Sequence, residues 1–170
     1  MASERFLADL TRLVPDLYRF AQSMTRNTDF AEELVSETVI TALKRWEGYT
    51  PGTNMTAWLF TIQANLYRNM LRKRHYRSLF ETDADATSVG IPAPQQGVVE
   101  LDDAIRIIEQ LPSEQRAALY LVCRDGHSYE EAARILDCEV GTVKSRVHRA
   151  RAAIAKAFEG ENDAAATPRP

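Results

Sequence analysis

A run of basic side chains in the last quarter of the chain has the chemistry to bind nucleic acid. Segment 141–158 contains five Lys or Arg residues and no acidic residue: Lys144, Arg146, Arg149, Arg151 and Lys156. Arginine can bond guanine edges with two hydrogen bonds, and both kinds of cation pair with phosphates. A basic helix taken by itself is more often a solvated charged face. The missing acids, together with the elements before this segment, favour DNA binding over that alternative.

The elements that must position these bases form a predicted helix-turn-helix. Ser128 and Glu131 have capping-box spacing and predict a helix over Tyr129–Leu136, which ends in a tight turn at 137–139. The next helix has an expected buried stripe of Val143, Val147, Ala150 and Ile154. The opposite face then carries Ser145, His148, Arg149, Ala152 and Lys156, with Thr142, Lys144, Arg146 and Arg151 on its flanks. Such a second helix can enter a major groove.

The residue types on this second helix suggest different contacts. Either Arg149 or Arg146 is expected to grip guanine edges, and Thr142 or Ser145 to reach bases or phosphates. Lys144 and Arg151 are expected to meet phosphates. Two supporting helices are expected upstream, the first ending at Leu111 and the second opened by Pro112 or Ser113.

A second candidate surface lies on the helix predicted after Asp29, which is expected to be its N-cap with Glu32 at the third position. The expected core stripe of this helix is Ala31, Val35, Val39, Ala42, Leu43 and Trp46. The opposite face carries Glu33, Glu37 and Lys44, with Leu34 and Ile40 on its flanks. This acidic ridge is either plain solvated surface or a protein-docking face, and periodicity does not decide between them.

The following helix is expected to be sandwiched between others, because two of its faces are apolar. One face is Trp58, Leu59, Ile62, Leu66 and Met70, and the other is Phe60, Ala64, Tyr67 and Leu71. Between them a polar stripe of Thr61, Asn65, Arg68 and Arg72 leads into the basic cluster Arg72, Lys73, Arg74 and Arg77. One or two cations would suit a helix C-terminus, but five from Arg68 to Arg77 indicate a polyanion. The preceding loop, with Asn54 near Tyr49 and Trp58, suits unstacked bases, so single-stranded nucleic acid is expected there.

Composition places these elements in two small all-helical domains. The chain is 45% hydrophobic and 26% charged, as in folded globular proteins. Its net charge of −3 excludes a protein whose whole surface is basic. Residues 81–99 are acidic, contain Pro and Gly, and have no apolar period, so they are expected to be a flexible linker. The linker separates an expected domain at 1–80 from one at 100–160, and residues 161–170 are expected to be a disordered tail.

Several classes of protein are disfavoured by what the sequence lacks. No apolar run approaches the roughly 18 residues of a membrane span, and the first residues show no signal-peptide pattern, so a cytoplasmic protein is expected. The two cysteines and three histidines have no metal-ligand spacing, and the histidines are expected at the surface or beside DNA. No phosphate-binding glycine loop or nucleophile motif occurs. We therefore expect no metal, no cofactor and no enzyme.

Four segments in order resemble the signature regions of the extracytoplasmic-function (ECF) RNA polymerase sigma factors. They are AEELVSETVITALKRW, PGTNMTAWLFTIQANLYRNMLRKRHYR, LPSEQRAALYLV and SYEEAARILDCEVGTVKSRVHRARAAI, and the resemblance spans roughly residues 10–158. PGTNMTAWLFTI and GHSYEEAARILDCEVGTVKSR are particularly similar to the alphaproteobacterial general-stress subgroup, which is EcfG-like. The resemblance implies an all-α protein with a sigma region 2 domain and a sigma region 4 domain. Its implied function is to give RNA polymerase promoter specificity for a stress regulon.

The resemblance also implies roles for particular residues. The first domain would bind the clamp helices of the polymerase β′ subunit through Glu33, Leu34, Ser36, Glu37 and Ile40. It would recognise and melt the promoter minus-ten element, with Asn54 and its loop holding a flipped base, through Asn54, Trp58, Thr61, Asn65, Arg68, Arg72, Lys73 and Arg74. The second domain would contact the β flap and read the minus-thirty-five element through Thr142, Lys144, Ser145, Arg146, His148, Arg149 and Arg151. The family often has Asp, Gln and Phe at positions 33, 36 and 39, where this chain differs.

The implied partners are core RNA polymerase, promoter DNA and a small helical anti-sigma factor that a sigma-mimicking response regulator titrates away. Two other classes are weighed against this one. A sigma-like decoy that sequesters an anti-sigma factor could dispense with its DNA-facing bases, yet these are intact here. An ordinary helix-turn-helix repressor acting as a symmetric dimer would leave the first domain and its basic stripe without a role.

Overall fold

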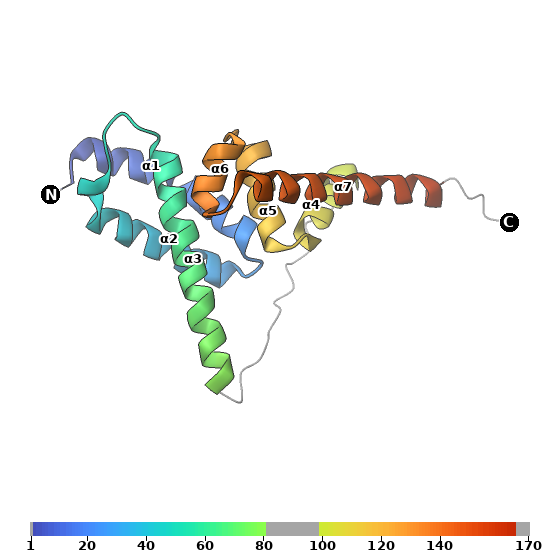
Figure 1. Cartoon of the computed structure of the whole chain (residues 1–170), viewed down its shortest axis with the longest axis horizontal. Coiled ribbons are helices and arrows are strands. Elements are labelled where there is room, and N and C mark those ends of the chain that lie inside the picture. Colours follow the sequence, from blue (N-terminus) through green and yellow to red (C-terminus); the bar gives the residue numbers. More distant parts are fainter. Residues whose placement is uncertain (1, 81–98, 166–170) are drawn as a thin grey trace. The chain divides into compact units, whose positions relative to one another are not determined.

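Helices account for nearly all of the chain that the structure describes. The computed structural model describes residues 2–80 and 99–165, with side chains described for 2–77 and 104–158. Within these ranges no strand occurs, which confirms the predicted all-helical class (Figure 1). Contacts divide the chain into two compact units, one built mainly from residues before position 90 and the other mainly from residues after it. The segment predicted to be a linker lies outside the described residues, except for Val99 at the start of a helix.

Within residues 2–80, the first unit has three long helices that pack against one another in pairs. They are α1 (Glu4–Met24), α2 (Thr28–Lys44) and α3 (Met55–Phe80), with the short 3-10 helix η1 (Trp46–Gly48) after α2. Their core is built from large apolar side chains without exposed surface: Leu17, Phe20, Leu34, Leu59 and Phe60. The rings of Phe20 on α1 and Phe60 on α3 lie 4.5 Å apart between centroids. This core fixes the helix faces that are left to solvent.

Helix α2 begins earlier and is rotated relative to the prediction. Its N-cap is Asn27, whose Oδ1 accepts from Phe30 N–H at 2.8 Å, and the predicted cap, Asp29, lies within the first turn, where the helix dipole favours an acid. The buried face is Phe30, Ala31, Leu34, Val35, Thr38 and Ala42. Leu43, predicted to be in the core, is instead 39% exposed. The buried face includes the polar residue Thr38. Its burial is possible because its hydroxyl donates to the carbonyl of Leu34 at 2.7 Å.

Helix α3 is sandwiched only over its first half. Leu59, Phe60, Ile62 and Ala64 are buried as the two apolar faces predicted, whereas Leu71 is 41% exposed and every residue from 71 to 77 is exposed. The fully buried Gln63 was not expected in the core. Its Nε2 donates to the carbonyl of Leu17 on α1 at 3.0 Å. This hydrogen bond offsets part of the free-energy cost of burying the side-chain amide. The basic end of α3 therefore projects beyond the helix packing of the first unit.

Within residues 99–165, the second unit contains four α-helices and one π-helical turn. These are α4 (Val99–Gln110), α5 (Ser113–Leu119), the π-helical η2 (Tyr120–Arg124), α6 (Tyr129–Leu136) and α7 (Val140–Ala165). α7 packs on α4 and α5 and continues to Ala165, so residues 161–165 are helical where a disordered tail was predicted. The rest of the predicted tail, residues 166–170, lies outside the described residues.

A buried arginine joins α4 to α5 in the second unit. Arg116 is 6% exposed, and its Nη1 donates to the carbonyls of Glu109 and Leu111 at the end of α4. The last carbonyls of a helix have no partner within the helix, so a buried cation is well placed there. Arg116 thereby fixes one of the two helices on which α7 rests.

Candidate nucleic-acid interface

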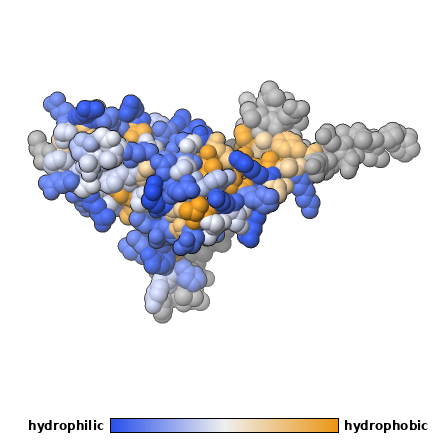
Figure 2. All heavy atoms as spheres, turned by 45° about the horizontal axis from the view of Figure 1, so that its top comes forward, coloured by the Kyte–Doolittle hydropathy of each residue, from blue (hydrophilic) through white to orange (hydrophobic). Residues whose placement is uncertain are grey.

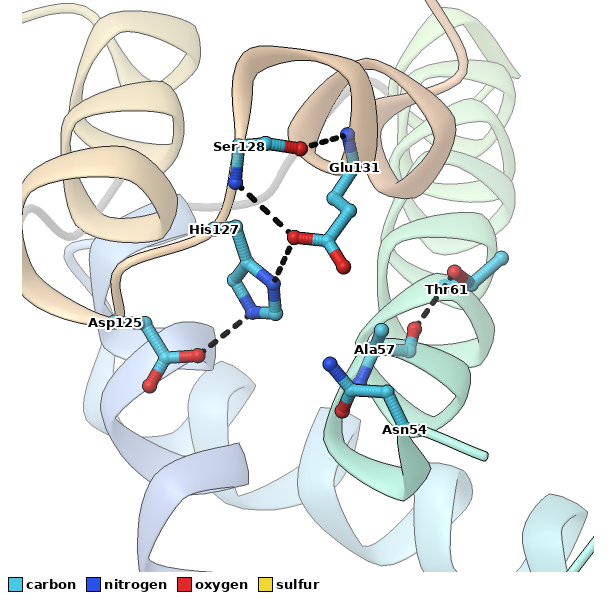
Figure 3. Close-up of polar contacts among 7 residues, drawn as sticks. All are labelled: Asn54, Ala57, Thr61, Asp125, His127, Ser128 and Glu131. Atoms are coloured by element: carbon cyan, nitrogen blue, oxygen red, sulfur yellow. Dashed lines mark hydrogen bonds and ion pairs between the residues drawn. The ribbon is translucent and has the colours of Figure 1, made fainter. Parts of the chain in front are cut away.

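The helix-turn-helix of the second unit begins with a reciprocal cap on α6 (Figure 3). Ser128 Oγ accepts from Glu131 N–H at 3.1 Å, and Glu131 Oε2 accepts from Ser128 N–H at 3.1 Å, which confirms the predicted capping box. After Leu136, Asp137 adopts a left-handed φ of 52°, a conformation that Asp tolerates better than most residues. This turn brings the chain to the start of α7 at Val140.

A buried histidine connects this cap to the turn before it. His127 is 7% exposed, with Nε2 2.7 Å from Asp125 Oδ2 and Nδ1 3.6 Å from Glu131 Oε2 (Figure 3). The hydrogen bond from Ser128 N–H, helped by nearby His127, lowers the pKa of the Glu131 carboxyl below its ordinary value. The expectation that every histidine lies at the surface or beside DNA is therefore wrong for His127, which supports α6.

Helix α7 presents its basic side chains opposite a buried stripe. Val143, Val147 and Ala150 are buried and Ile154 is half-buried, as its periodicity predicted. The exposed candidates on α7 are Lys144, His148, Arg149 and Arg151, while Thr142 and Ser145 are half-buried. Lys144 Nζ lies 5.7 Å from the ring centroid of Tyr129, and Arg151 Nη2 lies 3.2 Å from Cys123 Sγ. These two cations thus contact α6 and η2 while keeping exposed surface.

Arg146 is placed differently from the other bases of α7. Its side chain is 20% exposed, and its Nη2 lies 3.1 Å from Glu114 Oε2 on α5. Its Nη1 also lies 3.7 Å from Cys138 Sγ in the turn. Arg146 therefore links α7 to α5 and to the turn before α7. Of the two arginines proposed for guanine contact, Arg149 is the one with an exposed side chain.

The loop before α3 is a preformed turn. Tyr49 Oη donates to the carbonyl of Thr53 at 3.0 Å, while Thr53 N–H and Oγ1 donate to the carbonyl of Thr50 at 3.2 and 2.7 Å. Gly52 supplies the positive φ of 89° that this turn needs. The ring of Tyr49 lies 5.4 Å from that of Trp58 on α3, which anchors the loop to the helix.

Asn54 is the N-cap of α3 as well as a candidate base contact. Its Oδ1 accepts from Ala57 N–H at 3.1 Å (Figure 3). Its carbonyl accepts from Trp58 N–H at 3.1 Å. The acceptor of the side-chain amide is therefore used by the helix, which leaves the amide N–H groups of this exposed residue as donors. Thr61 is similarly occupied, because its hydroxyl donates to the carbonyl of Ala57 at 2.8 Å.

Several arginines of α3 are held by neighbouring side chains. Asn65 Oδ1 accepts from Arg68, and Asn69 Oδ1 accepts from Arg72, one turn apart in each case. Lys73 and Arg74 are exposed at the projecting end of the helix. Arg74 reaches α2, where its Nη2 lies 3.2 Å from Glu33 Oε2. The polar stripe expected from sequence is thus present, with its cations oriented by local partners.

The acidic ridge of α2 is exposed, with one exception among its candidate residues. Glu33, Ser36 and Glu37 are exposed, and Ile40 is 42% exposed. Leu34 has no exposed surface and belongs to the core stripe of α2, so its assignment to a docking face is wrong in this structure. A face bearing carboxylates beside an exposed isoleucine suits a protein partner with cationic and apolar groups.

Comparison with known proteins identifies the family. The model for Sigma-70 region 2 matches residues 10–77, and the model for Sigma-70, region 4 matches residues 101–154. The ECF RNA polymerase sigma factor EcfG of Rhodopseudomonas palustris is 43% identical over 144 residues, which cover 84% of this chain and 79% of the relative. The chain belongs to the ECF sigma factors. Its function is to give RNA polymerase promoter specificity.

Two other relatives agree with the assignment of this sigma factor. The ECF sigma-E factor of Escherichia coli is 34% identical over 134 residues, which cover 72% of this chain and 70% of the relative. The solved structure of the sigma factor RpoE of Bartonella quintana, in complex with the anti-sigma factor NepR, has a TM-score of 0.79 at 35% identity. That match covers 92% of this chain and 98% of the RpoE chain.

Some supporting residues of this sigma factor had no signal in its sequence. Glu114 and Phe30 fix Arg146 and Arg74 respectively, but each pair joins different helices and shows no periodic spacing.

The described residues contain no group of three or more His, Cys, Asp or Glu that could hold a metal ion. Nor does any described helix have the length and apolar character needed to cross a membrane.

Proposed function

We propose that the two units of this ECF sigma factor divide promoter recognition between them. The second unit reads the minus-thirty-five element with α7, and the first binds the polymerase with α2 and the minus-ten element with α3 and its preceding loop. The observation that carries this proposal is that exposed cations gather on two separate helices, each within a matched sigma region. A repressor that reads a single site would need only one of them.

On α7 the proposed base-reading residue is Arg149, with Thr142 and Ser145 as shorter polar contacts. Its exposure supports this role, since a guanidinium must be free to reach the O6 and N7 atoms of a guanine. Lys144, His148 and Arg151 are proposed to contact phosphates along the groove. Arg146 contributes by keeping α7 on α5 through Glu114. Contact of this unit with the β flap of the polymerase is part of the same proposal.

On the first unit, the loop ending at Asn54 is proposed to receive a base flipped out of the minus-ten element. The turn is already closed by hydrogen bonds from Tyr49 and Thr53, so little conformational entropy is lost when a base binds. The remaining contacts to this element are proposed for Trp58, Thr61, Asn65, Arg68, Arg72, Lys73 and Arg74. They line α3 after the loop and run toward its basic end.

The polymerase-docking face is proposed to comprise Glu33, Ser36, Glu37 and Ile40 on α2, without Leu34. Exposed carboxylates on this ridge would pair with cationic groups on the clamp helices of the β′ subunit. The protein would then act in the cytoplasm, where the polymerase is, as a specificity subunit without a catalytic site of its own.

Regulation by an anti-sigma factor is proposed from the likeness to RpoE of Bartonella quintana, which was solved in complex with the anti-sigma factor NepR. A small helical protein of that kind would cover surfaces that the polymerase and promoter need. Together with the likeness to EcfG, this supports control of a stress regulon.

Run-off transcription tests the proposal directly. Fragmented genomic DNA of the source organism is transcribed by purified core polymerase with and without the full chain. Transcripts that begin at a shared motif only when the chain is added are the expected result. Absence of both such transcripts and polymerase binding would contradict the proposal and favour a decoy that sequesters an anti-sigma factor.

A further inference from the structure

An ion pair joins the basic end of α3 to the acidic ridge of α2. Arg74 Nη2 lies 3.2 Å from Glu33 Oε2, with the side chains 51% and 55% exposed respectively. Arg74 is a proposed DNA contact, and Glu33 is a proposed polymerase contact. The ion pair therefore joins a residue proposed to bind DNA to a residue proposed to bind the polymerase. Either partner would have to compete with the ion pair for its own contact.

The position of Arg74 is fixed by a second contact. Its guanidinium carbon lies 3.7 Å from the centroid of the Phe30 ring, one turn before Glu33 on α2. Phe30 is 3% exposed, and the ring of Tyr67 lies 5.7 Å from it between centroids. Tyr67 in turn donates its hydroxyl to the carbonyl of Met24 at 2.7 Å, which ties α3 to the end of α1. A cation over an aromatic face beside a carboxylate is held more firmly than by either contact alone.

The Glu33 carboxylate weakens the binding of a phosphate to Arg74 as long as no other cation pairs with Glu33. A phosphate oxygen placed on the guanidinium would lie close to the Glu33 carboxylate and be repelled by it. A cationic group of the polymerase that pairs with Glu33 would remove this repulsion and weaken the hold of α2 on Arg74. Binding at one face would thus raise affinity at the other, and the coupling must act equally in both directions.

We propose that Glu33 and Phe30 are positioning residues that hold Arg74 back from DNA until polymerase binds Glu33. This inference rests on the proposed function, because it takes α2 as the docking face and α3 as the DNA-binding helix. It predicts that the free chain binds DNA more weakly than the chain bound to polymerase. The surface pair is of ordinary strength, so the effect on affinity should be at most about fivefold.

The first experiment measures binding of the free full-length chain to a fluorescent mixed-sequence DNA single strand by anisotropy. Glu33→Gln should tighten binding by about two- to fivefold at low salt. It should also steepen the dependence of log affinity on log salt concentration by about 0.7, the value for one additional phosphate contact on single-stranded DNA. The matched control is Glu32→Gln, which removes the same charge from the neighbouring exposed position of α2. The control should leave the salt slope unchanged.

A double variant shows whether the gain acts through Arg74. Glu33→Gln combined with Arg74→Ala should bind DNA no better than Arg74→Ala alone. Far-UV circular dichroism would check that the helices of each variant are intact. Equal gains from Glu33→Gln and Glu32→Gln, or a gain that persists without Arg74, would overturn the inference.

The reciprocal experiment uses core polymerase without DNA. Arg74→Ala frees Glu33 and should tighten polymerase binding by about two- to fivefold, although Arg74 lies outside the proposed docking face. Arg77→Ala, which removes an equal charge about one turn further along α3, should not. If the wild-type chain does not bind core polymerase at all, the proposed function itself has failed. If it binds and directs transcription but the two alanine variants behave alike, only the coupling is wrong.

Discussion

Two basic helices of this sigma factor present their cations in different ways. On α7, Arg149 and Lys144 are exposed above a buried stripe of valine and alanine, and only Arg146 among the described α7 cations is tied to a carboxylate. On α3, Arg74 is paired with Glu33, and other arginines are bonded to asparagines one turn away. On the face drawn in Figure 2, hydrophilic side chains predominate, with apolar patches between them. Basic residues of equal charge can therefore be ready for DNA or restrained from it, according to their neighbours.

The most severe way to break this comparison is to disturb α2, which carries the partners of Arg74. Leu34→Ala removes a side chain with no exposed surface and should lower the free energy of unfolding by about 2–5 kcal/mol, measured by urea denaturation. Ile40→Ala, at a position that is 42% exposed, should cost less than about 1 kcal/mol. Similar small losses for both variants would show that Leu34 is not a core residue.

Reversing a charge on the proposed docking face should separate the roles of the two helices. Glu37→Arg places a cation where the proposed partner is also cationic and should weaken binding to core polymerase by about tenfold or more. The stability of the chain should change little, because Glu37 is exposed. Surface plasmon resonance with immobilised core polymerase measures the effect. Unchanged affinity would mean that the acidic ridge is merely solvated.

The contrast between Arg149 and Arg146 sharpens the comparison within α7. Arg149→Ala should cost about 1–3 kcal/mol in holoenzyme binding to a promoter with its minus-thirty-five element, and leave both stability and polymerase binding unchanged. Arg146→Ala should instead lower the melting temperature, because the ion pair with Glu114 on α5 is lost. Promoter binding and thermal unfolding are measured for both variants. Loss of polymerase binding in Arg149→Ala would contradict its assignment to DNA.

The smallest expected effect is a dependence of stability on pH at the cap of α6. The pKa of Glu131 is lowered from 4.5 by the Ser128 N–H in the folded chain, so its carboxylate stabilises the fold above about pH 4.5. This stabilisation is lost as the pH falls through the lowered value. Wild type should exceed Glu131→Gln in unfolding free energy at neutral pH, with the gap closing in acid. A gap that is constant with pH would show that the charge of Glu131 contributes nothing.

The helix-turn-helix was largely predictable because its signals are local. The capping box of Ser128 and Glu131 spans three positions, and the valine stripe of α7 follows helical periodicity. Helix α2 was less predictable, since hydropathy places Thr38 outside although a hydrogen bond to Leu34 lets it be buried. The expected core stripe left out Thr38 and placed Leu34 on a flank, although neither side chain has exposed surface.

Contacts between helices were beyond the reach of sequence periodicity. Nothing in the spacing of Arg74 and Glu33, or of Arg146 and Glu114, predicts that they meet. His127 was likewise expected at the surface, because its burial depends on Asp125 and Glu131 placing carboxylates on both sides of its ring. Residue types identified the candidate surfaces, and tertiary contacts determine which of their members are accessible.

The π-helical turn η2 accommodates one extra residue between α5 and α6. Asp125 N–H bonds the carbonyl of Tyr120 five residues earlier, so the turn holds one residue more than an α-helical turn would. Deleting a single residue here would leave an ordinary α-helical turn, so the residues that follow would keep roughly their direction around the helix axis. A deletion within a regular helix such as α7 would instead rotate every following residue by about 100°. Loss of one residue should therefore be tolerated better in η2 than in α7.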